Sequence, residues 1–249
     1  ILMFAAFAVL FYRSLRYRRY LVGYKRGKYN FTDILSLNKM GWMVGLQMGL
    51  ETALFSITGI MIGWLGSIAL AAHQVMVAIS TLGFMIYYGV GAAVSVRVSN
   101  YFGRQELLHV RRTTMAGFHL ILCLAVCACT VFLFSRELIG YLFTTSEEVI
   151  RVVSTLVYIL LAYQFGDALQ ITYANSLRGI GDVISMAVIS FIGYFLIAMP
   201  VCYICGFVLE WGITGIWIGY PIGLTLTGVM LCGRYYWKLK TKTQSKEFY

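Results

Sequence analysis

Charged residues are scarce in this chain: they make up 12% of its 249 residues, whereas hydrophobic residues make up 60%. The mean hydropathy is +0.78. A soluble domain of this size needs much more polar surface to cover its core. The composition therefore excludes an ordinary soluble globular protein and predicts an integral membrane protein.

Segments of alternating polarity are also missing, and the strands of a transmembrane β-barrel would show them. The apolar segments instead run for about 20 residues or more without alternation, which is the length of a membrane-spanning helix. Proline occurs 2 times and glycine 25 times, which suits helices that pack closely through small residues. We expect an all-α integral membrane protein built as a six-transmembrane-helix bundle.

Cysteine is present at 6 positions, but not in the pattern of a metal or redox centre. Cys202 and Cys205 have the Cys-x-x-Cys spacing, yet they lie within an apolar segment without a second pair or a nearby histidine. We interpret the cysteines as small packing residues. Enzyme motifs are missing too, since Gly179-Ile-Gly181 lacks the rest of a phosphate-binding loop and no nucleophile motif occurs. We therefore expect that the protein is not an enzyme.

Hydropathy divides the chain into four parts. Residues 1–12 resemble the cytoplasmic end of a truncated transmembrane helix, because the arginines follow the apolar stretch, unlike in a secretory signal. Residues 13–39 are predicted to form a basic cytoplasmic loop, 40–236 a six-helix transmembrane lobe, and 237–249 a basic cytoplasmic tail. The six predicted spans are Met40–Leu65, Ile68–Val98, Met115–Phe134, Val149–Asn175, Val183–Leu209 and Ile213–Tyr235.

The basic residues outnumber the acidic ones and give a formal net charge of +10. If residues 13–39 are cytoplasmic, every lysine and arginine except Arg136 and Arg151 lies on that side. The positive-inside rule then places both ends of the chain in the cytoplasm, as in a multi-pass protein of the inner (plasma) membrane. Since no soluble domain carries these charges, we expect membrane lipid as their partner and no nucleic acid.

Two glycine ladders have a spacing of four residues, which puts each ladder on one face of a helix. One consists of Gly41, Gly45 and Gly49 in the first span. The other, in the last span, consists of Gly215, Gly219 and Gly223. Because glycines allow two helix backbones to approach closely, we predict that both ladders are packing faces.

Two acidic residues, Glu51 and Asp167, lie within predicted spans rather than in loops or at span ends. Each is roughly 16 Å from the cytoplasmic end of its span at 1.5 Å per residue, so both are near the middle of the bilayer. A charge at this depth costs on the order of 2.5–3.5 kcal/mol on insertion scales. Such residues therefore face an aqueous cavity or a partner.

Polar residues accompany both acids at helical spacing. Gln47 and Thr58 lie on roughly the same helix face as Glu51, and Tyr163, Gln164 and Gln170 flank Asp167. One interpretation is that the acids are merely hydrogen-bonded inside the bundle. The other, which we favour, is a cation site that exchanges protons, Na⁺ or a cationic substrate. The predicted site residues are Glu51, Asp167, Tyr163, Gln47 and Gln170, with Glu51 and Asp167 as the metal ligands if the ion is Na⁺.

Histidines are the remaining candidates for proton transfer within the spans. His73 begins the second span and His119 lies near the inner end of the third. We interpret both as hydrogen-bonded packing residues rather than as a proton relay.

Three segments resemble the second lobe of the multidrug and toxic compound extrusion (MATE) transporters, in the bacterial NorM-like branch. They are Leu70-Ala-Ala-His-Gln-Val75, the stretch Gly89-Val-Gly-Ala-Ala-Val-Ser-Val-Arg-Val-Ser-Asn100, and Leu177-Arg-Gly-Ile-Gly-Asp182. The resemblance extends from about Leu35 to Lys238. It departs from the common pattern at residues 41–44, where many relatives have a proline.

The resemblance implies twelve helices in two six-helix lobes around a central cavity, of which this chain holds helices 7–12. It implies exchange of Na⁺ or H⁺ for organic cations, with no other cofactor. Glu51 matches the acidic residue of the seventh helix, and Tyr163 and Asp167 match the tyrosine and aspartate of the tenth. The implied partners are small cationic substrates and a missing N-terminal six-helix lobe.

The leading hypothesis is therefore a secondary active antiporter that exports organic cations, drugs or metabolites by alternating access. One alternative is a lipid-linked oligosaccharide flippase of the same superfamily, which would need a more cationic cavity. The other is a non-transporting membrane scaffold, which has no need of paired acids in mid-membrane.

Overall fold

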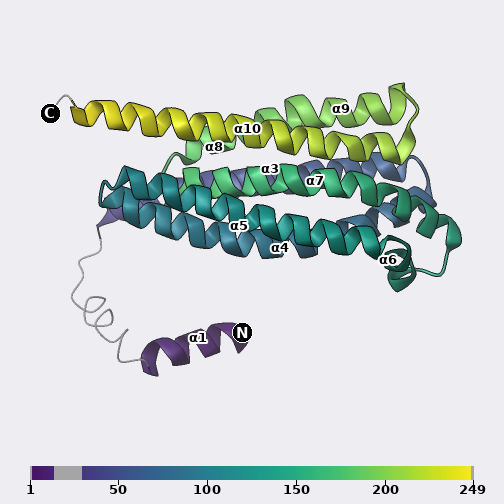
Figure 1. Ribbon diagram of the computed structural model, residues 1–249, viewed down its shortest axis with the longest axis horizontal. Coiled ribbons are helices and arrows are strands. Elements are labelled where there is room, and N and C mark those ends of the chain that lie inside the picture. The colour runs from purple at the N-terminus through teal and green to yellow at the C-terminus, as the bar shows by residue number, and fades with distance from the viewer. Residues whose placement is uncertain (1, 14–29, 248–249) are drawn as a thin grey trace. The chain divides into compact units, whose positions relative to one another are not determined.

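A computed structural model describes residues 2–13 and 30–247 of the chain (Figure 1). Helix α1 spans Leu2–Arg13, α3 spans Phe31–Gly63, α4 spans Ser67–Gly103 and α5 spans Leu107–Phe134. The short helix α6 covers Arg136–Phe143, and α7 covers Glu147–Gly179. A further helix follows in four consecutive pieces: α8 (Val183–Phe191), the π-helix η1 (Ile192–Ala198), α9 (Met199–Tyr203) and the π-helix η2 (Ile204–Val208). Helix α10 runs from Gly212 to Glu247.

The described residues are all-α, with no strand among them, and this confirms the predicted fold class. Six helices are long and apolar enough to cross a membrane: Phe31–Gly63, Ser67–Gly103, Leu107–Phe134, Glu147–Gly179, Val183–Val208 and Gly212–Gln244. They coincide with the six predicted spans and identify a multi-pass membrane protein.

The helices extend beyond the predicted spans at several ends. The first begins at Phe31 instead of Met40, so residues 31–39, predicted as loop, are helical. The third begins at Leu107 instead of Met115, and the last continues to Glu247 instead of ending at Tyr235. Hydropathy detects only the apolar part of a helix, whereas the intrahelical hydrogen bonds continue into polar ends. Residues 14–29 of the predicted loop lie outside the described range.

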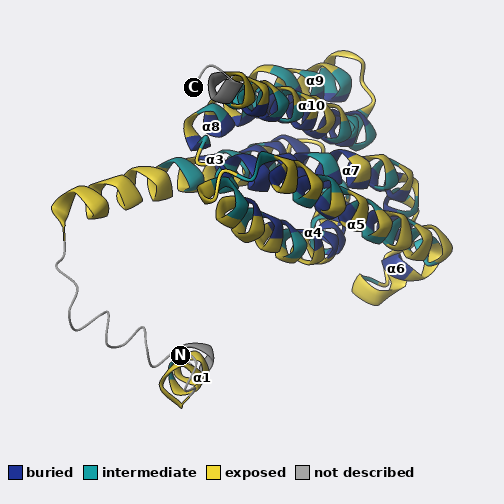
Figure 2. Ribbon diagram, turned by 60° about the vertical axis from the view of Figure 1, so that its left-hand side comes forward, coloured by how far each residue is buried: buried dark blue, intermediate teal, exposed yellow. Residues whose placement is uncertain are grey.

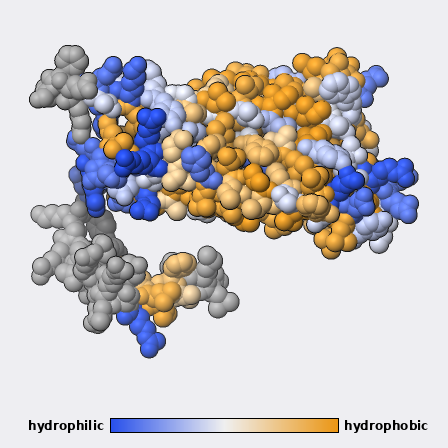
Figure 3. Space-filling view, in the orientation of Figure 1, coloured by the Kyte–Doolittle hydropathy of each residue, from blue (hydrophilic) through white to orange (hydrophobic). Residues whose placement is uncertain are grey.

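The chain divides into two units, Ile1–Gly41 and Trp42–Tyr249. In the second unit α7 packs against α4, α5 and α10. Half of the most apolar segment of α7 is buried, whereas only 17% of the corresponding segment of α5 is buried. Figure 2 shows the buried residues in dark blue along the helices of the bundle. Hydrophobic residues cover the middle of this unit's surface while hydrophilic ones gather at its ends (Figure 3), as expected for a bundle surrounded by lipid.

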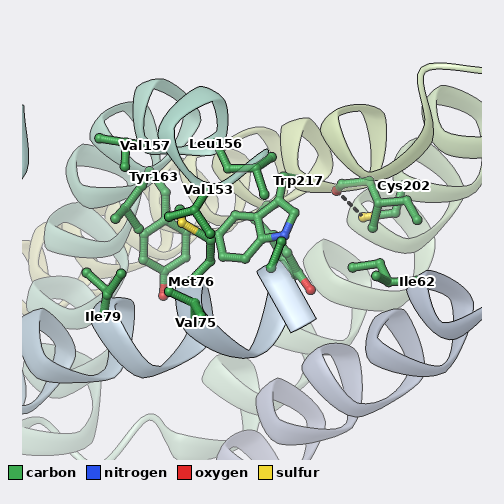
Figure 4. Packing of buried hydrophobic residues seen from close by; sticks show 14 of the residues in the cluster. Ile62, Val75, Met76, Ile79, Val153, Leu156, Val157, Tyr163, Cys202 and Trp217 are labelled. Carbon is green, nitrogen blue, oxygen red and sulfur yellow. Dashed lines mark hydrogen bonds between the residues drawn. The ribbon is translucent and has the colours of Figure 1, made fainter. Parts of the chain in front are cut away.

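The main hydrophobic cluster joins residues from α3, α4, α7, α10 and the helix that begins at Val183. Figure 4 shows the rings of Tyr163 and Trp217 packed among aliphatic side chains, including Met76 and Leu156. Cys202 belongs to this cluster, where its thiol donates to the Ile216 carbonyl oxygen over 3.2 Å. All six cysteines are free thiols. The packing role predicted for the cysteines is confirmed for Cys202 and is wrong for Cys123 and Cys127, which are exposed on α5.

The two glycine ladders differ. A Cβ at Gly215, Gly219 or Gly223 would overlap atoms of Cys205, Cys202 and Ala198, so this ladder packs directly on the preceding helix. A Cβ at Gly41, Gly45 or Gly49 would meet nothing within 4 Å. Close packing was thus predicted correctly for the last span and is wrong for the first within the described part of the chain.

Candidate functional site

The predicted site residues come from two helices of the second unit. Gln47 and Glu51 lie one turn apart on α3, while Tyr163, Asp167 and Gln170 follow one face of α7. Asp167 and Gln170 are buried, and Glu51 is half-buried. These five side chains belong to one polar cluster in the interior of the bundle.

Glu51 is held by hydrogen bonds on one side. Its Oε2 accepts from Gln47 Nε2 over 3.2 Å and from the hydroxyl of Tyr194 over 3.4 Å. Gln47 Oε1 in turn accepts from the guanidinium of Arg178 over 3.4 Å. Gln47 therefore positions Glu51, as its spacing predicted, and connects it to a cation on α7.

Asp167 has the opposite surroundings. It is 0% exposed, and neither of its carboxyl oxygens has a hydrogen-bond partner among the described residues. Both polar atoms of the neighbouring Gln164 and Oε1 of Gln170 are unpartnered in the same way. Buried acceptors without a donor are costly, so a native structure satisfies them with something else. A proton, a cation or water would do so here.

An open cavity of about 260 Å³ reaches the cluster from the side of α3 and α4. Among the described residues, Glu51 is the one acidic side chain that lines it, and Tyr163 lies beside it. The wall is otherwise apolar, aromatic or hydroxyl-bearing: Met48, Thr52, Phe55, Val77, Ser80, Thr81, Phe84 and Met85. This combination of an apolar wall with a single negative group suits an organic molecule that carries a positive charge.

The cluster offers oxygen ligands of the kind that hard cations prefer. Glu51 and Asp167 bring carboxyl oxygens to the cluster, and the amide oxygen of Gln170 has no hydrogen-bond partner among the described residues. No group of three or more His, Cys, Asp or Glu residues forms a metal site in the described ranges. The donors that the cluster presents are therefore carboxyl and amide oxygens from no more than two acidic residues.

Thr58 does not join the acids, although it lies on roughly the same face of α3. Its hydroxyl forms a short hydrogen bond with the hydroxyl of Tyr220 from α10. The helix rises about 10 Å between Glu51 and Thr58, which is too far for the two side chains to share a ligand.

The histidines also differ from the prediction. His73 is buried with its ring edge-on to Trp217, but its Nδ1 has no hydrogen-bond partner in the described structure. His119 is exposed beside Phe118. For His73 the packing part of the prediction is confirmed, because its buried ring contacts Trp217, whereas the hydrogen bond expected of it is not formed by Nδ1 in the described structure. His119 is exposed on α5, so the packing role predicted for it is wrong.

Tyr194 is the cluster residue that the sequence did not reveal. It is fully buried, and besides contacting Glu51 it accepts a hydrogen bond from Gln170 Nε2 over 2.8 Å. In the sequence Tyr194 is recognisable only as a tyrosine within an apolar segment. Tyr203 is a tyrosine in the same span but is exposed, so this feature does not distinguish a site residue.

Comparison with known proteins gives one consistent result. The family model described as MatE matches residues 44–204, more than half of the chain. The "Multidrug resistance protein NorM" of Photobacterium profundum is 34% identical over 220 residues, which cover 86% of this chain and 47% of that protein. The protein of the same name from Vibrio cholerae is 32% identical over 214 residues, covering 84% and 47%. The chain thus spans about half the length of the curated relatives it matches.

Solved structures agree in fold. The crystal structure of the eukaryotic MATE transporter AtDTX14 superposes with a TM-score of 0.77 at 20% identity, over 87% of this chain and 51% of that one. A crystal structure of MATE in complex with MaL6 gives a TM-score of 0.80 at 14% identity, over 87% and 49%.

Proposed function

Since the chain belongs to the MatE family, we propose that it is one lobe of a secondary active antiporter that exports organic cations, drugs or metabolites in exchange for Na⁺ or H⁺. The observation that carries this proposal is the pair of membrane-embedded carboxyl groups. Glu51 lies beside an open cavity, and Asp167 is enclosed without a hydrogen-bond partner among the described residues. The names of the relatives, which refer to multidrug resistance and to MATE transport, support transport rather than catalysis.

The two acids have complementary roles in this proposal. Glu51 receives a cation or a cationic substrate from the cavity, because it is the acidic group on the cavity wall. Asp167 stabilises the coupling ion from the enclosed side, because its two oxygens lack any other donor among the described residues. Since both carboxylates attract positive charge, a coupling ion and a cationic substrate compete for the same region, and this competition is what exchange requires.

The proposal includes partners outside this chain. Because the chain spans about half the length of its relatives, an N-terminal six-helix lobe is expected to close the cavity from the other side. We place the lobe in the inner membrane with both ends in the cytoplasm, on the basis of the positive-inside distribution. Anionic lipid headgroups then contact the basic inner end.

The test is uphill efflux from proteoliposomes that contain this chain joined to its N-terminal lobe, under imposed Na⁺ or proton gradients. Glu51→Gln and Asp167→Asn should each abolish uphill efflux while the protein still inserts, since the amides keep size and hydrogen bonding but remove the ionisable charge. Asp33→Asn is the matched control, because Asp33 lies in the first turn of α3 outside the cluster. If both amide variants drive efflux at near wild-type rates, Glu51 and Asp167 are structural residues.

A further inference from the structure

A second open cavity, of about 480 Å³, adjoins the one that Glu51 lines. Thr52, Phe55 and Val77 line both, so the two cavities form one continuous groove along α3 and α4, the α3–α4 groove. Glu51 lines only the first part of this groove, and His73 lines only the second. The α3–α4 groove therefore has an acidic end and an imidazole end.

His73 is the buried polar residue of the second cavity, with 2% of its surface exposed. Its Nε2 lies beside Gly59, another residue of the cavity wall, where an added Cβ would be 3.5 Å from this nitrogen. Neither Nε2 nor Nδ1 has a hydrogen-bond partner among the described residues. A neutral imidazole offers one donor and one acceptor. Since buried polar groups are rarely left unpaired, a molecule in the cavity is the remaining source of a partner.

The imidazole is held in place from behind. The ring of Trp217, which is fully buried, meets the ring of His73 edge to face with 5.8 Å between the ring centroids. On the α3 side the wall beside Nε2 is a glycine, so no side chain there lies over the nitrogen. A polar group that packing holds in one position beside open space suits the recognition of a ligand.

The middle of the α3–α4 groove is aromatic and apolar. Phe55, which lines both cavities, stacks on the buried ring of Tyr220 with 4.8 Å between the centroids. A flat apolar body can pack on such a supported ring. From Glu51 to Gly59, the neighbour of His73, helix α3 rises about 12 Å at 1.5 Å per residue. An occupant of the whole groove is thus an elongated molecule.

We infer that the α3–α4 groove binds an elongated organic cation, with its positive group at Glu51 and a neutral hydrogen-bonding group, such as a hydroxyl, carbonyl or amide, at His73. The cationic end rests on the proposed function. The His73 end adds selectivity among cations, because a molecule that lacks the distal polar group leaves the buried imidazole unpaired. Sites built to form a hydrogen bond reject analogues that cannot form it.

The measurement is equilibrium binding of two probes to this chain joined to its N-terminal lobe, in lipid nanodiscs at one pH and without Na⁺. One probe is (biphenyl-4-ylmethyl)trimethylammonium, and the other carries a hydroxyl at the 4′ position, opposite the ammonium. A hydroxyl both donates and accepts, so it can pair with either tautomer of the imidazole. The hydroxylated probe should bind about tenfold more tightly, because its hydroxyl pairs with a buried group that has no other partner.

His73→Phe keeps a ring beside Trp217 and removes both nitrogens. It should abolish the preference for the hydroxylated probe and leave the affinity for the unsubstituted probe unchanged. His119→Phe is the matched control, since it makes the same exchange at an exposed position on α5, and it should keep the tenfold preference.

Equal affinities of the two probes for the wild type overturn the inference, and so does an undiminished preference in His73→Phe. If His73→Phe does not fold, Gly59→Ala decides. Its methyl fits at an ordinary contact distance but stands against Nε2, so the preference should fall, and an unchanged preference overturns the inference.

Glu51→Gln tests the cationic end separately. It should weaken the binding of both probes by the same factor and leave their ratio unchanged, which supports the two-ended arrangement. Wild-type affinity for both probes in Glu51→Gln would refute the role of Glu51 in the proposed function. The preference that depends on His73 is measured as a ratio, so its outcome is read independently of that result.

Discussion

Asp182 and Arg234 show how two residues join the turn between α7 and α8 to α10. Arg234 Nε on α10 donates to the Asp182 carboxylate over 2.8 Å, and Ser185 donates to its other oxygen over 2.9 Å. The ion pair is largely shielded from solvent, with Asp182 only 9% exposed. Removing one partner of a shielded ion pair is costly, because it leaves the other charge buried without its partner.

Removing this charge should therefore destabilise the lobe. Asp182→Asn weakens the hydrogen bonds from Arg234 and Ser185, at about 1.5–3 kcal/mol for a bond to a charged group. The melting temperature in detergent should fall by roughly 2–4 °C per kcal/mol lost. Glu106→Gln is the control, since Glu106 pairs with His109 on the surface and should have little effect. Equal melting temperatures for wild type and Asp182→Asn would contradict this role.

The same pair predicts a pH dependence. Burial by itself raises the pKa of Asp182, but the hydrogen bonds from Arg234 and Ser185 outweigh it, and the pKa lies below its usual value. The stabilisation is thus fully present above the pKa of the unfolded carboxyl, about 3.9, and is lost as pH falls through the lower folded value. The difference in melting temperature between wild type and Asp182→Asn should be constant near neutral pH and shrink below about pH 4.

At the scale of elements, the two glycine ladders differ in their surroundings: one is packed against a neighbouring helix and the other is exposed. Helix α10 uses Gly215, Gly219 and Gly223 to approach the preceding helix, while the ladder of α3 contacts none of the described residues. The same sequence pattern thus has two structural outcomes. The difference arises because α10 is enclosed by the bundle, whereas α3 turns its ladder outward.

A pair of matched substitutions tests this difference. Gly219→Ala should lower the free energy of unfolding by about 1–3 kcal/mol, because the added methyl overlaps Cys202 and crowds the Ala198 carbonyl oxygen. Gly45→Ala should be neutral or slightly stabilising, since alanine is the better helix former and nothing lies in its way. Thermal unfolding in detergent measures both. The idea fails if the two variants are destabilised equally.

At the scale of the whole molecule, the arrangement in the membrane is a prediction that labelling can check. Nearly all lysines and arginines lie on the side that we assign to the cytoplasm. A cysteine in place of Thr145, between α6 and α7, should react with a membrane-impermeant reagent added outside intact cells. One in place of Gln244, at the inner end of α10, should react only after the membrane is opened. The reverse pattern would refute the orientation. Tyr29, a further inner position for a label, lies outside the described residues.

The sequence by itself determined the number and the approximate positions of the spans, because the length of each apolar run can be read directly from the order of the residues. It also singled out Glu51 and Asp167, because a carboxyl group within such a run is conspicuous wherever the helix lies in the fold. Gln47 was recognised for a similar reason, since a partner one turn away on the same helix follows from helical geometry alone.

Only the tertiary structure decided which helices meet and through which faces. Tyr194 and Glu51, which form a hydrogen bond, are 143 residues apart in the sequence, and Arg178 and Gln47, which form another, are 131 residues apart. In the described part of the chain, Asp167 has no hydrogen-bond partner and one glycine ladder packs whereas the other does not, and both findings likewise depend on the assembled bundle. These contacts depend on how each helix is rotated and shifted against its neighbours. Hydropathy leaves that arrangement open, because many rotations bury similar apolar area.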